Sequence, residues 1–305
     1  MRIGEILSYL DRMNIKYSFS GDETFEIHSF CPLKDLKENS ITWARKLDDT
    51  IVSEINNQKG ILVFIANNGA DKEVMCNYIM TENPHRTFFQ VLEQFFYKKP
   101  EIKSPRLSVI DAKKIGNNTC IGELCYIGPD VIIGEECVIG NNVTIEGKVT
   151  IGNHVIIDSG VRIGAAGFGH YMNDDGTSNW IPHLGGVTIG NHVFIGANTI
   201  VARGTLSDTI IKDYVMIDAL CGICHNSEVH ERAIIAGGAG VAGSAIVQED
   251  SWLGPGCIVN AGITVGKGCL IGINSVVSHD VPDGKYAFGV PAKIIADNND
   301  KKYKI

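Results

Sequence analysis

The chain has 305 residues, of which 44% are hydrophobic and 20% are charged, the ordinary balance of a water-soluble protein. Its formal net charge of −8 argues against nucleic-acid binding, which needs a basic surface. No apolar run is long enough to span a bilayer, and the charged N-terminal stretch MRIGEILSYLDRMN is unlike a secretory signal. We therefore expect a cytoplasmic protein without stable membrane insertion.

Residues 1–105 predict a small α/β domain. A first helix is indicated by the spacing of Ile3, Ile6, Leu7 and Leu10. The apolar run GILVFIA at 60–66 predicts a buried strand. A second helix starts at Asn83 and Pro84, and its apolar face consists of Phe88, Val91, Leu92, Phe95 and Phe96. The stretch KKPEIKSP at 98–105 is typical of a linker.

From residue 115 onwards, aliphatic residues recur at every sixth position. The count is unbroken over 115–163 and over 211–277, and between these ranges it includes Ile189, Ile195 and Val201. Hexapeptide periodicity is the sequence signature of a parallel β-helix, in which three short strands make one triangular coil. Coils stack at about 4.8 Å, the distance between neighbouring strands. We predict this β-helix over 106–281, followed by a short C-terminal segment, 282–305.

Nine cysteines in a chain without a secretory signal favour reduced thiols over disulfides. Cys221 and Cys224 form a CxxC pair, but no second pair completes a zinc site. Cys221 instead falls at one phase of the six-residue repeat, which it shares with Cys125, Cys137, Cys257 and Cys269. We therefore expect these cysteines to be structural, and we expect no metal.

Two stretches interrupt the repeat. Residues 165–186 form a long loop, AAGFGHYMNDDGTSNWIPHLGG, and GTLSDT at 204–209 adds four residues to one turn. Loops that leave a rigid solenoid are where binding residues usually sit. Trp180 and His183 in the long loop are therefore candidates for lining an acceptor cleft, although Trp180 has an alternative role in pinning the loop.

The repeat also places side chains above one another. His225 and Gly243 share one phase in successive coils, so they are predicted to be neighbours on one face. Arg203 falls one coil below, because the inserted turn absorbs the extra four residues, and Ala261 continues the column above.

This column can support acyl transfer to an amine. A histidine can take the amine proton, and a glycine N–H can stabilise an oxyanion. The small residues Gly243 and Ala261 leave room for a pantetheine arm. A lone histidine on a solenoid wall is more often merely solvent-exposed, so these residues alone leave both interpretations of His225 open.

Several longer stretches match a known enzyme family. They are ENSITWARK and NPHRTFFQVLEQFF in the N-terminal part, and GFGH…NWIPHLGGVTIGNHVFIGANTIVARGTLSDTII, ICHNSEV and IAGGAGVAGSAIV in the solenoid. In these stretches the chain resembles the UDP-3-O-acylglucosamine N-acyltransferases of lipid A synthesis. The resemblance implies a left-handed parallel β-helix and a homotrimer with its site between subunits.

The resemblance also implies roles for individual residues. His225 is the catalytic histidine of a His-Asn pair with Asn226, and the amide of Gly243 stabilises the oxyanion. Asp218 matches an acidic position that either orients the imidazole or binds the sugar, unless it is only a solvated residue at a coil edge.

Several positions depart from this family. A second active-site histidine is replaced near Ala261 and Gly262, and the uracil-binding aromatic–Asn–Tyr group corresponds to Trp43, Lys46 and Asp49. The family's long C-terminal helices are absent. The ending YAFGVPAKII instead resembles sugar acetyltransferases that use coenzyme A, which places Lys293, with Ala261, near that cofactor.

These features favour an N-acyltransferase that moves an acyl group from acyl-CoA to the amine of a dTDP- or UDP-linked amino sugar, for lipopolysaccharide or O-antigen synthesis. Substrate-binding residues are then expected at Asp218, Asn226, Trp180, His183 and Arg203. The alternative is a lipid A N-acyltransferase that depends on acyl carrier protein. O-acylation is a close variant that the same residues allow.

Two further functions stay open. Gamma-class carbonic anhydrases share the solenoid and carry two histidines five apart, the spacing of His225 and His230, but a third zinc ligand would fall at Ile189, and His192 is out of phase. Metal analysis tests this function. The changed uracil-binding group also suits a non-catalytic sugar-nucleotide sensor or scaffold, which would fail to consume acyl-CoA with any amino sugar.

Overall fold

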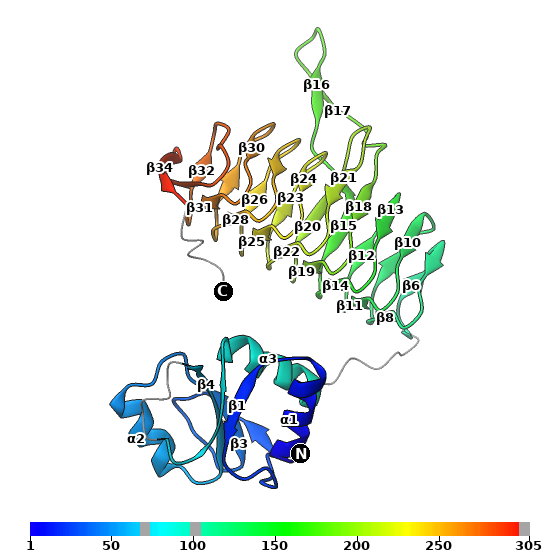
Figure 1. Cartoon of the computed structure of the whole chain (residues 1–305). Coiled ribbons are helices and arrows are strands. Elements are labelled where there is room, and N and C mark those ends of the chain that lie inside the picture. Colours follow the sequence, from blue (N-terminus) through cyan, green and yellow to red (C-terminus); the bar gives the residue numbers. More distant parts are fainter. Residues whose placement is uncertain (68–73, 98–104, 299–305) are drawn as a thin grey trace. The chain divides into compact units, whose positions relative to one another are not determined.

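The computed structural model describes residues 1–67, 74–97 and 105–298 (Figure 1). The chain divides into two compact units, Met1–Lys99 and Pro100–Ile305, and the division falls inside the stretch predicted as a linker. None of the helices in the described ranges is both long and apolar enough to cross a membrane.

In its described residues, the first unit has a five-stranded sheet and three α-helices. The strand order is β1-β5-β4-β3-β2; β1 runs antiparallel to β5, and the other pairings are parallel. The strands are β1 (Tyr17–Ser20), β2 (Ser29–Phe30), β3 (Ser40–Trp43), β4 (Ile61–Ala66) and β5 (Asn77–Thr81). The helices are α1 (Ile3–Arg12), α2 (Asp49–Asn57) and α3 (Pro84–Phe95). The two predicted helices and the predicted strand are confirmed as α1, α3 and β4.

The start signal predicted for α3 has a direct physical basis. The side chain of Asn83 accepts a hydrogen bond from the N–H of Arg86, and Pro84 occupies the first turn, where no intrahelical donor is needed. The apolar face of α3 then packs on the sheet, with the rings of Phe88 and Phe64 edge to face at 5.9 Å. The aromatic residues of this helix are therefore core residues, as their spacing predicts.

The second unit is a parallel β-solenoid with three walls, each a sheet of stacked strands (Figure 1). The first wall consists of β6 (Val109–Ile110), β9 (Tyr126–Ile127), β12 (Thr144–Ile145), β15 (Arg162–Ala166), β20 (Ile200–Arg203), β23 (Gly222–Ile223), β26 (Gly240–Val241), β29 (Ile258–Val259) and β32 (Val276–Val277). The second wall consists of β7 (Lys114–Ile115), β10 (Val131–Ile133), β13 (Val149–Ile151), β18 (Val187–Ile189), β21 (Thr209–Ile211), β24 (Glu228–Val229), β27 (Ile246–Val247) and β30 (Thr264–Val265).

The third wall consists of β8 (Cys120–Ile121), β11 (Val138–Ile139), β14 (Ile156–Ile157), β19 (Phe194–Ile195), β22 (Met216–Ile217), β25 (Ile234–Ile235), β28 (Trp252–Leu253), β31 (Leu270–Ile271), β33 (Lys285–Phe288) and β34 (Lys293–Asp297). The strand β34 closes this wall by running antiparallel to β33. The predicted parallel β-helix is therefore confirmed.

The aliphatic residues of the repeat face inwards and form one continuous core. From Ile127 to Val277 they are buried, whereas Ile115 in the first coil is 37% exposed. The cysteines of the repeat also lie inside: the thiol of Cys137 donates to the carbonyl of Gly152 at 3.2 Å, and burial raises the pKa of Cys257 to about 12. The structural interpretation of these cysteines is confirmed.

Both interruptions leave the solenoid at the corner between the first and second walls. The long loop joins β15 to β18, and most of it forms a hairpin of β16 (His170–Met172) and β17 (Ser178–Trp180), which projects from the solenoid (Figure 1). The shorter insertion joins β20 to β21 one coil later. The register resumes after each, with Val149 beside Val187 and Val187 beside Thr209.

The inward and outward positions of one strand should differ sharply in stability. Ile133 on β10 is fully buried, so Ile133→Ala is expected to lower the free energy of unfolding by about 2–5 kcal/mol. Its neighbour Ile132 faces outwards and is half-buried, so Ile132→Ala is expected to cost less than half as much. Chemical denaturation followed by circular dichroism measures both losses of stability. Equal losses would contradict the assignment of Ile133 to the core and of Ile132 to the outward face.

Candidate active site

The predicted neighbours His225 and Gly243 lie one coil apart at the corner between the first and second walls. Strands β23 and β26 pair in register, with Ile223 beside Val241. The pairing continues into the corner, where the N–H of Ser244 donates to the carbonyl of His225 at 2.9 Å. The sequence prediction of this adjacency is confirmed.

The imidazole of His225 lies between two glycines. A Cβ atom on Gly243 would lie 2.7 Å from both Cε1 and Nε2 of the ring, and a Cβ atom on Gly167 would lie 2.8 Å from its Cβ and 2.9 Å from its Cδ2. Neither position has room for a side chain while the ring stays in place. Gly167 was not identified from the sequence, because its place beside His225 depends on the path of the long loop.

Asn226 fixes the tautomer of the His225 ring. The Oδ1 atom of Asn226 accepts from the N–H of Thr205 at 2.9 Å, and its Nδ2 donates to the carbonyl of Ser207 at 3.1 Å, so the amide can have one orientation only. The Nδ1 atom of His225 lies 3.1 Å from the same Oδ1 and must therefore donate. The neutral ring then carries its lone pair on Nε2, which together with Cε1 forms the ring edge nearest to Gly243.

A backbone donor lies beside this lone pair. Within the described residues, the N–H of Gly243 donates to no protein acceptor, whereas its carbonyl accepts from the N–H of Gly262 at 3.0 Å. A glycine N–H without a neighbouring side chain can approach a developing oxyanion closely. A proton acceptor and an unused hydrogen-bond donor thus face the same space.

The base of the long loop packs against His225 from the other side. The His183 ring contacts the His225 ring edge to face at 5.2 Å, and Trp180 stacks on His183 at 6.0 Å while its Nε1–H donates to the carbonyl of Gly167 at 3.3 Å. His183 is only 5% exposed; its Nδ1 donates to the carbonyl of Ile181 at 2.9 Å, and its Nε2 has no partner among the described residues. These contacts support the pinning role of Trp180, while its role in lining an acceptor cleft stays a prediction.

A cavity of about 760 Å³ runs along this corner over several coils. It is lined by Ala166, Gly167, Phe168, Ala202, Cys224, His225, Gly243, Ser244, Ala261 and Gly262. The small residues Gly243, Ala261 and Gly262 line the part of this cavity on the coils that follow His225 in the chain. Ala261 therefore lies in the column where the sequence predicts it. Phe168 is 81% exposed and stands at the loop side of the opening.

Two residues expected in the site lie elsewhere. Asp218 lies at the corner between the third and first walls, where its side chain accepts from the N–H groups of Ala219 and Gly237. Within one chain Asp218 therefore does not contact the His225 ring, whose Nδ1 atom is bound by Asn226, and its alternative role in sugar binding stays a prediction. Lys293 lies on the terminal strand β34, exposed and outside the cavity lining.

The zinc ligand pair suggested by the sequence is not assembled. The Nε2 atom of His230 lies 3.0 Å from a carboxylate oxygen of Glu228, so this ring has a local partner on the second wall. No three His, Cys, Asp or Glu side chains in the described ranges converge as ligands would. The side chains beside His225 are those of His183 and Asn226 instead.

Cys224 is a second potential nucleophile in the cavity. The side chain is exposed at the surface of the cavity, but partial desolvation by the cavity wall raises the pKa of its thiol above the ordinary value, so the thiol is protonated at neutral pH. The thiolate is the nucleophilic form of cysteine, and this environment disfavours it.

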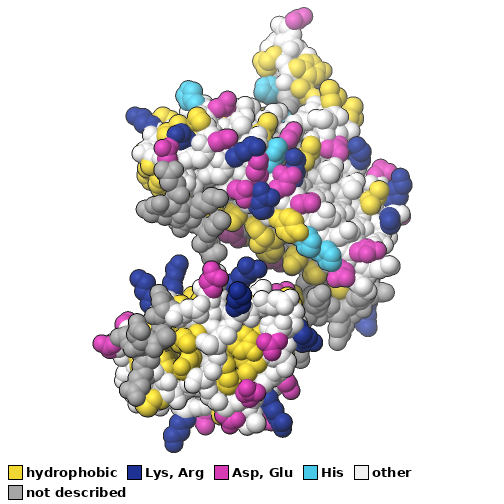
Figure 2. Space-filling view, viewed as in Figure 1, with side chains coloured by type: hydrophobic (Ala, Val, Ile, Leu, Met, Phe, Trp, Pro, Cys, Tyr) yellow, Lys and Arg dark blue, Asp and Glu magenta, His cyan; other side chains and the backbone are white. Residues whose placement is uncertain are grey.

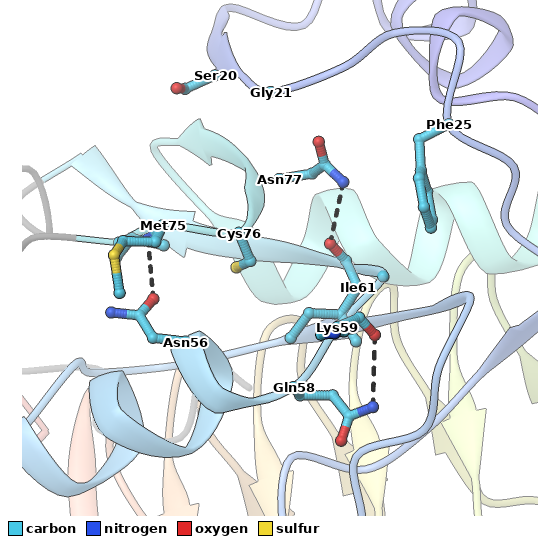
Figure 3. A pocket seen from close by; sticks show the side chains of 12 residues that line it. Ser20, Gly21, Phe25, Asn56, Gln58, Lys59, Ile61, Met75, Cys76 and Asn77 are labelled. Carbon is cyan, nitrogen blue, oxygen red and sulfur yellow. Dashed lines mark hydrogen bonds between the residues drawn. The ribbon is translucent and has the colours of Figure 1, made fainter.

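The first unit contains a separate pocket of about 350 Å³ (Figure 3). It lies at the amino ends of β4 and β5, and its amides are bonded within the protein: Asn77 to the carbonyl of Ile61, and Gln58 to the carbonyl of Lys59. The residues at the family's uracil-binding positions are elsewhere, around the carboxyl end of β3, where Trp43 contacts the ring of His85 at 4.7 Å. The pocket is therefore distinct from those positions.

Comparisons with known proteins agree with this fold. A family model described as "Bacterial transferase hexapeptide (six repeats)" matches residues 112–147, and one described as "Hexapeptide repeat of succinyl-transferase" matches residues 130–165, 186–206 and 245–279. Two solved structures are similar: a UDP-N-acetylglucosamine acyltransferase from Campylobacter jejuni (25% identity, TM-score 0.58, 65% of this chain and 75% of that one) and LpxA from Acinetobacter baumannii (24%, 0.58, 65% and 75%). The matched segments of the solenoid are thus similar to the hexapeptide repeats of bacterial transferases.

Two curated relatives specify the resemblance further. The UDP-3-O-acylglucosamine N-acyltransferase of Albidiferax ferrireducens is 40% identical over 119 residues, and that of Methylorubrum extorquens is 38% identical over 131 residues. These matches cover 39% and 43% of the chain, but only 36% and 37% of the relatives' own length. The resemblance to this family that the sequence indicates is confirmed over that segment.

Proposed function

We propose that the chain is an N-acyltransferase that transfers an acyl group from a thioester to the amine of a UDP-linked amino sugar of the lipid A type. The observation that carries the proposal is the free Nε2 of His225 beside the unused N–H of Gly243. The names of the curated relatives support a UDP-linked acylglucosamine and the lipid A alternative, in preference to a dTDP-linked sugar for O-antigen synthesis.

The proposed mechanism is direct transfer. His225 Nε2 takes a proton from the amine as its nitrogen attacks the thioester carbonyl, and a C–N bond forms. The resulting oxyanion accepts a hydrogen bond from the Gly243 N–H. The intermediate collapses with cleavage of the C–S bond, and the leaving thiolate takes the proton from the imidazolium, which returns His225 to its starting state.

The acyl donor is a phosphopantetheine thioester, the chemistry that acyl-CoA and acyl carrier protein share. We place its arm over the small residues Gly243, Ala261 and Gly262 of the cavity. The sequence ending favours acyl-CoA with Lys293 near the cofactor, whereas the lipid A resemblance favours the carrier protein. Assays with both donors, on UDP- and dTDP-linked amino sugars, separate these possibilities.

We also propose that the protein acts as a homotrimer of left-handed solenoids, with the site completed by a second copy. The support is the outward face of the third wall, where side chains at register-paired positions are all apolar: Val138, Ile156, Phe194, Met216, Ile234, Trp252 and Leu270. On the second wall the corresponding column includes the charged residues Lys114 and Glu228. A continuous apolar column suits a permanent interface.

The base is tested by His225→Ala. Turnover is expected to fall by at least about 10²-fold, the usual contribution of a general base. His230→Ala is the matched control: direct transfer leaves its rate near that of the parent, whereas a zinc enzyme with this histidine pair loses activity in both variants. Steady-state rates with UDP-linked amino sugars measure both. A near-normal rate for His225→Ala would exclude its role as the base.

Direct transfer is tested by Cys224→Ala. Because the raised pKa keeps the thiol of Cys224 protonated, its removal is expected to leave the rate within about threefold of the parent. Mass spectrometry of the parent enzyme, quenched during turnover without acceptor, is expected to detect no acyl group on Cys224. Loss of activity together with an acylated thiol would replace direct transfer by a two-step mechanism.

The apolar face is tested by Met216→Glu. Met216 is 45% exposed on the third wall, so a charge there is expected to break the assembly and lower the molar mass measured by light scattering after size-exclusion chromatography. Ile132→Glu places the same charge on the outward face of the second wall and is expected to leave the mass unchanged. If Met216→Glu retains the parent mass, the third wall is not the interface.

A further inference from the structure

Arg203 is a cation without a partner next to the proposed active site. It ends β20, and because Val201 pairs with Ile223, it lies one coil below His225, about 4.8 Å along the solenoid. Its Nε is buried, and within the described residues its guanidinium makes no hydrogen bond or ion pair. Arginine has five N–H donors, so this arrangement leaves all of its hydrogen-bonding capacity unused.

The guanidinium of Arg203 packs against the backbone of a glycine, Gly147. A Cβ atom on Gly147 would lie 2.6 Å from Nη1 of Arg203, so the group occupies the space that a side chain at position 147 would fill. The nearby cation Lys148 has a partner, since its ammonium lies 3.3 Å from a carboxylate oxygen of Asp208. Among the described residues at this part of the corner, Arg203 therefore brings a positive charge that no carboxylate compensates.

An unpaired and partly buried guanidinium is unfavourable unless an anion compensates it. Other cations of the solenoid show the usual solution: Arg232 makes two hydrogen bonds to Asp250, at 2.8 and 2.9 Å, and Lys267 lies 2.8 Å from Glu249. The planar guanidinium fork matches a phosphate group with two parallel hydrogen bonds. The missing partner of Arg203 is thus expected to be an anion that arrives with a ligand.

We propose that Arg203 binds a phosphate of the acceptor's nucleotide diphosphate, an inference that rests on the proposed function. The direction of the side chain decides between the two phosphate-bearing substrates. His225 Nε2 points up the solenoid to Gly243, whereas the Arg203 guanidinium points down it to Gly147. The acyl donor lies over the upper coils, so an anion at Arg203 belongs to the end of the acceptor remote from its amine.

The test measures binding without catalysis, by isothermal titration of UDP and of coenzyme A into the whole protein. Arg203→Met is expected to weaken UDP binding at least about tenfold, the order of one charge-assisted hydrogen-bonding group, and to leave coenzyme A binding unchanged. Arg203→Lys keeps the charge but cannot make two parallel hydrogen bonds to a phosphate. Its UDP affinity is therefore expected to lie between those of the parent and of Arg203→Met. Arg232→Met is the matched control, because it removes an arginine that already has a partner.

A second variant perturbs the site while it keeps the arginine. Gly147→Ala places a methyl group against Nη1 and is expected to weaken UDP binding severalfold, with melting temperatures showing that each variant is folded. Unchanged UDP affinity in Arg203→Met, or no UDP binding by the parent, would overturn the proposal. An equal loss of coenzyme A affinity would assign Arg203 to the donor instead. If His225→Ala stays active while Arg203→Met binds UDP more weakly, the proposed role of His225 as the base is wrong and the proposed phosphate site at Arg203 is supported.

Discussion

The arrangement of the site depends on the backbone pairing between successive coils. Successive rungs of the solenoid are hydrogen-bonded in register, as Ile223 is to Val241, apart from a one-residue shift between β15 and β20. Inward-facing aliphatic residues oppose a slip of a whole strand by one residue. A side chain at a given phase therefore has fixed neighbours one rung above and one rung below. This is why a histidine, a glycine and an arginine that are far apart in sequence form one column.

The column becomes a site because side chains are missing from it. Gly243 and Gly167 leave the space that the His225 ring fills, and Gly147 leaves the space that the Arg203 guanidinium fills. The ring's Nδ1 is held by Asn226, whose amide is itself fixed by Thr205 and Ser207 of the shorter insertion. Two of the buried polar atoms without partners in the described residues, His183 Nε2 and Arg203 Nε, belong to this same neighbourhood.

The sequence was sufficient wherever the six-residue count was unbroken. It predicted the solenoid, the buried cysteines and the adjacency of His225 and Gly243, because phase alone determines these features. It could not predict Gly167 or the contact of His183 with His225, since both depend on how a loop outside the repeat folds back. The resemblance gave Asp218 a role at the imidazole or at the sugar, although its phase, one past Ile217 on the third wall, places it at another corner of the same chain.

Two corners of the solenoid differ in whether they carry insertions. At the corner between the second and third walls, successive coils place a residue with positive φ at the same position. His154, His192 and Tyr214 occupy this position in three successive coils, and their rings stack with centroids 4.7 and 4.8 Å apart. These two histidines are thus stacked with one another. The corner between the first and second walls instead carries both insertions, on the two coils directly below His225.

This difference explains the projecting hairpin. Its base is fixed by the Trp180 bond to Gly167 and by the buried ring of His183, and hydrophobic side chains are exposed on the projection below its tip (Figure 2). An isolated two-stranded hairpin is marginally stable in water, and its anchored base compensates for this. The packing that anchors the arm is the packing that holds the His225 ring, so the loop and the proposed base are a single structural unit.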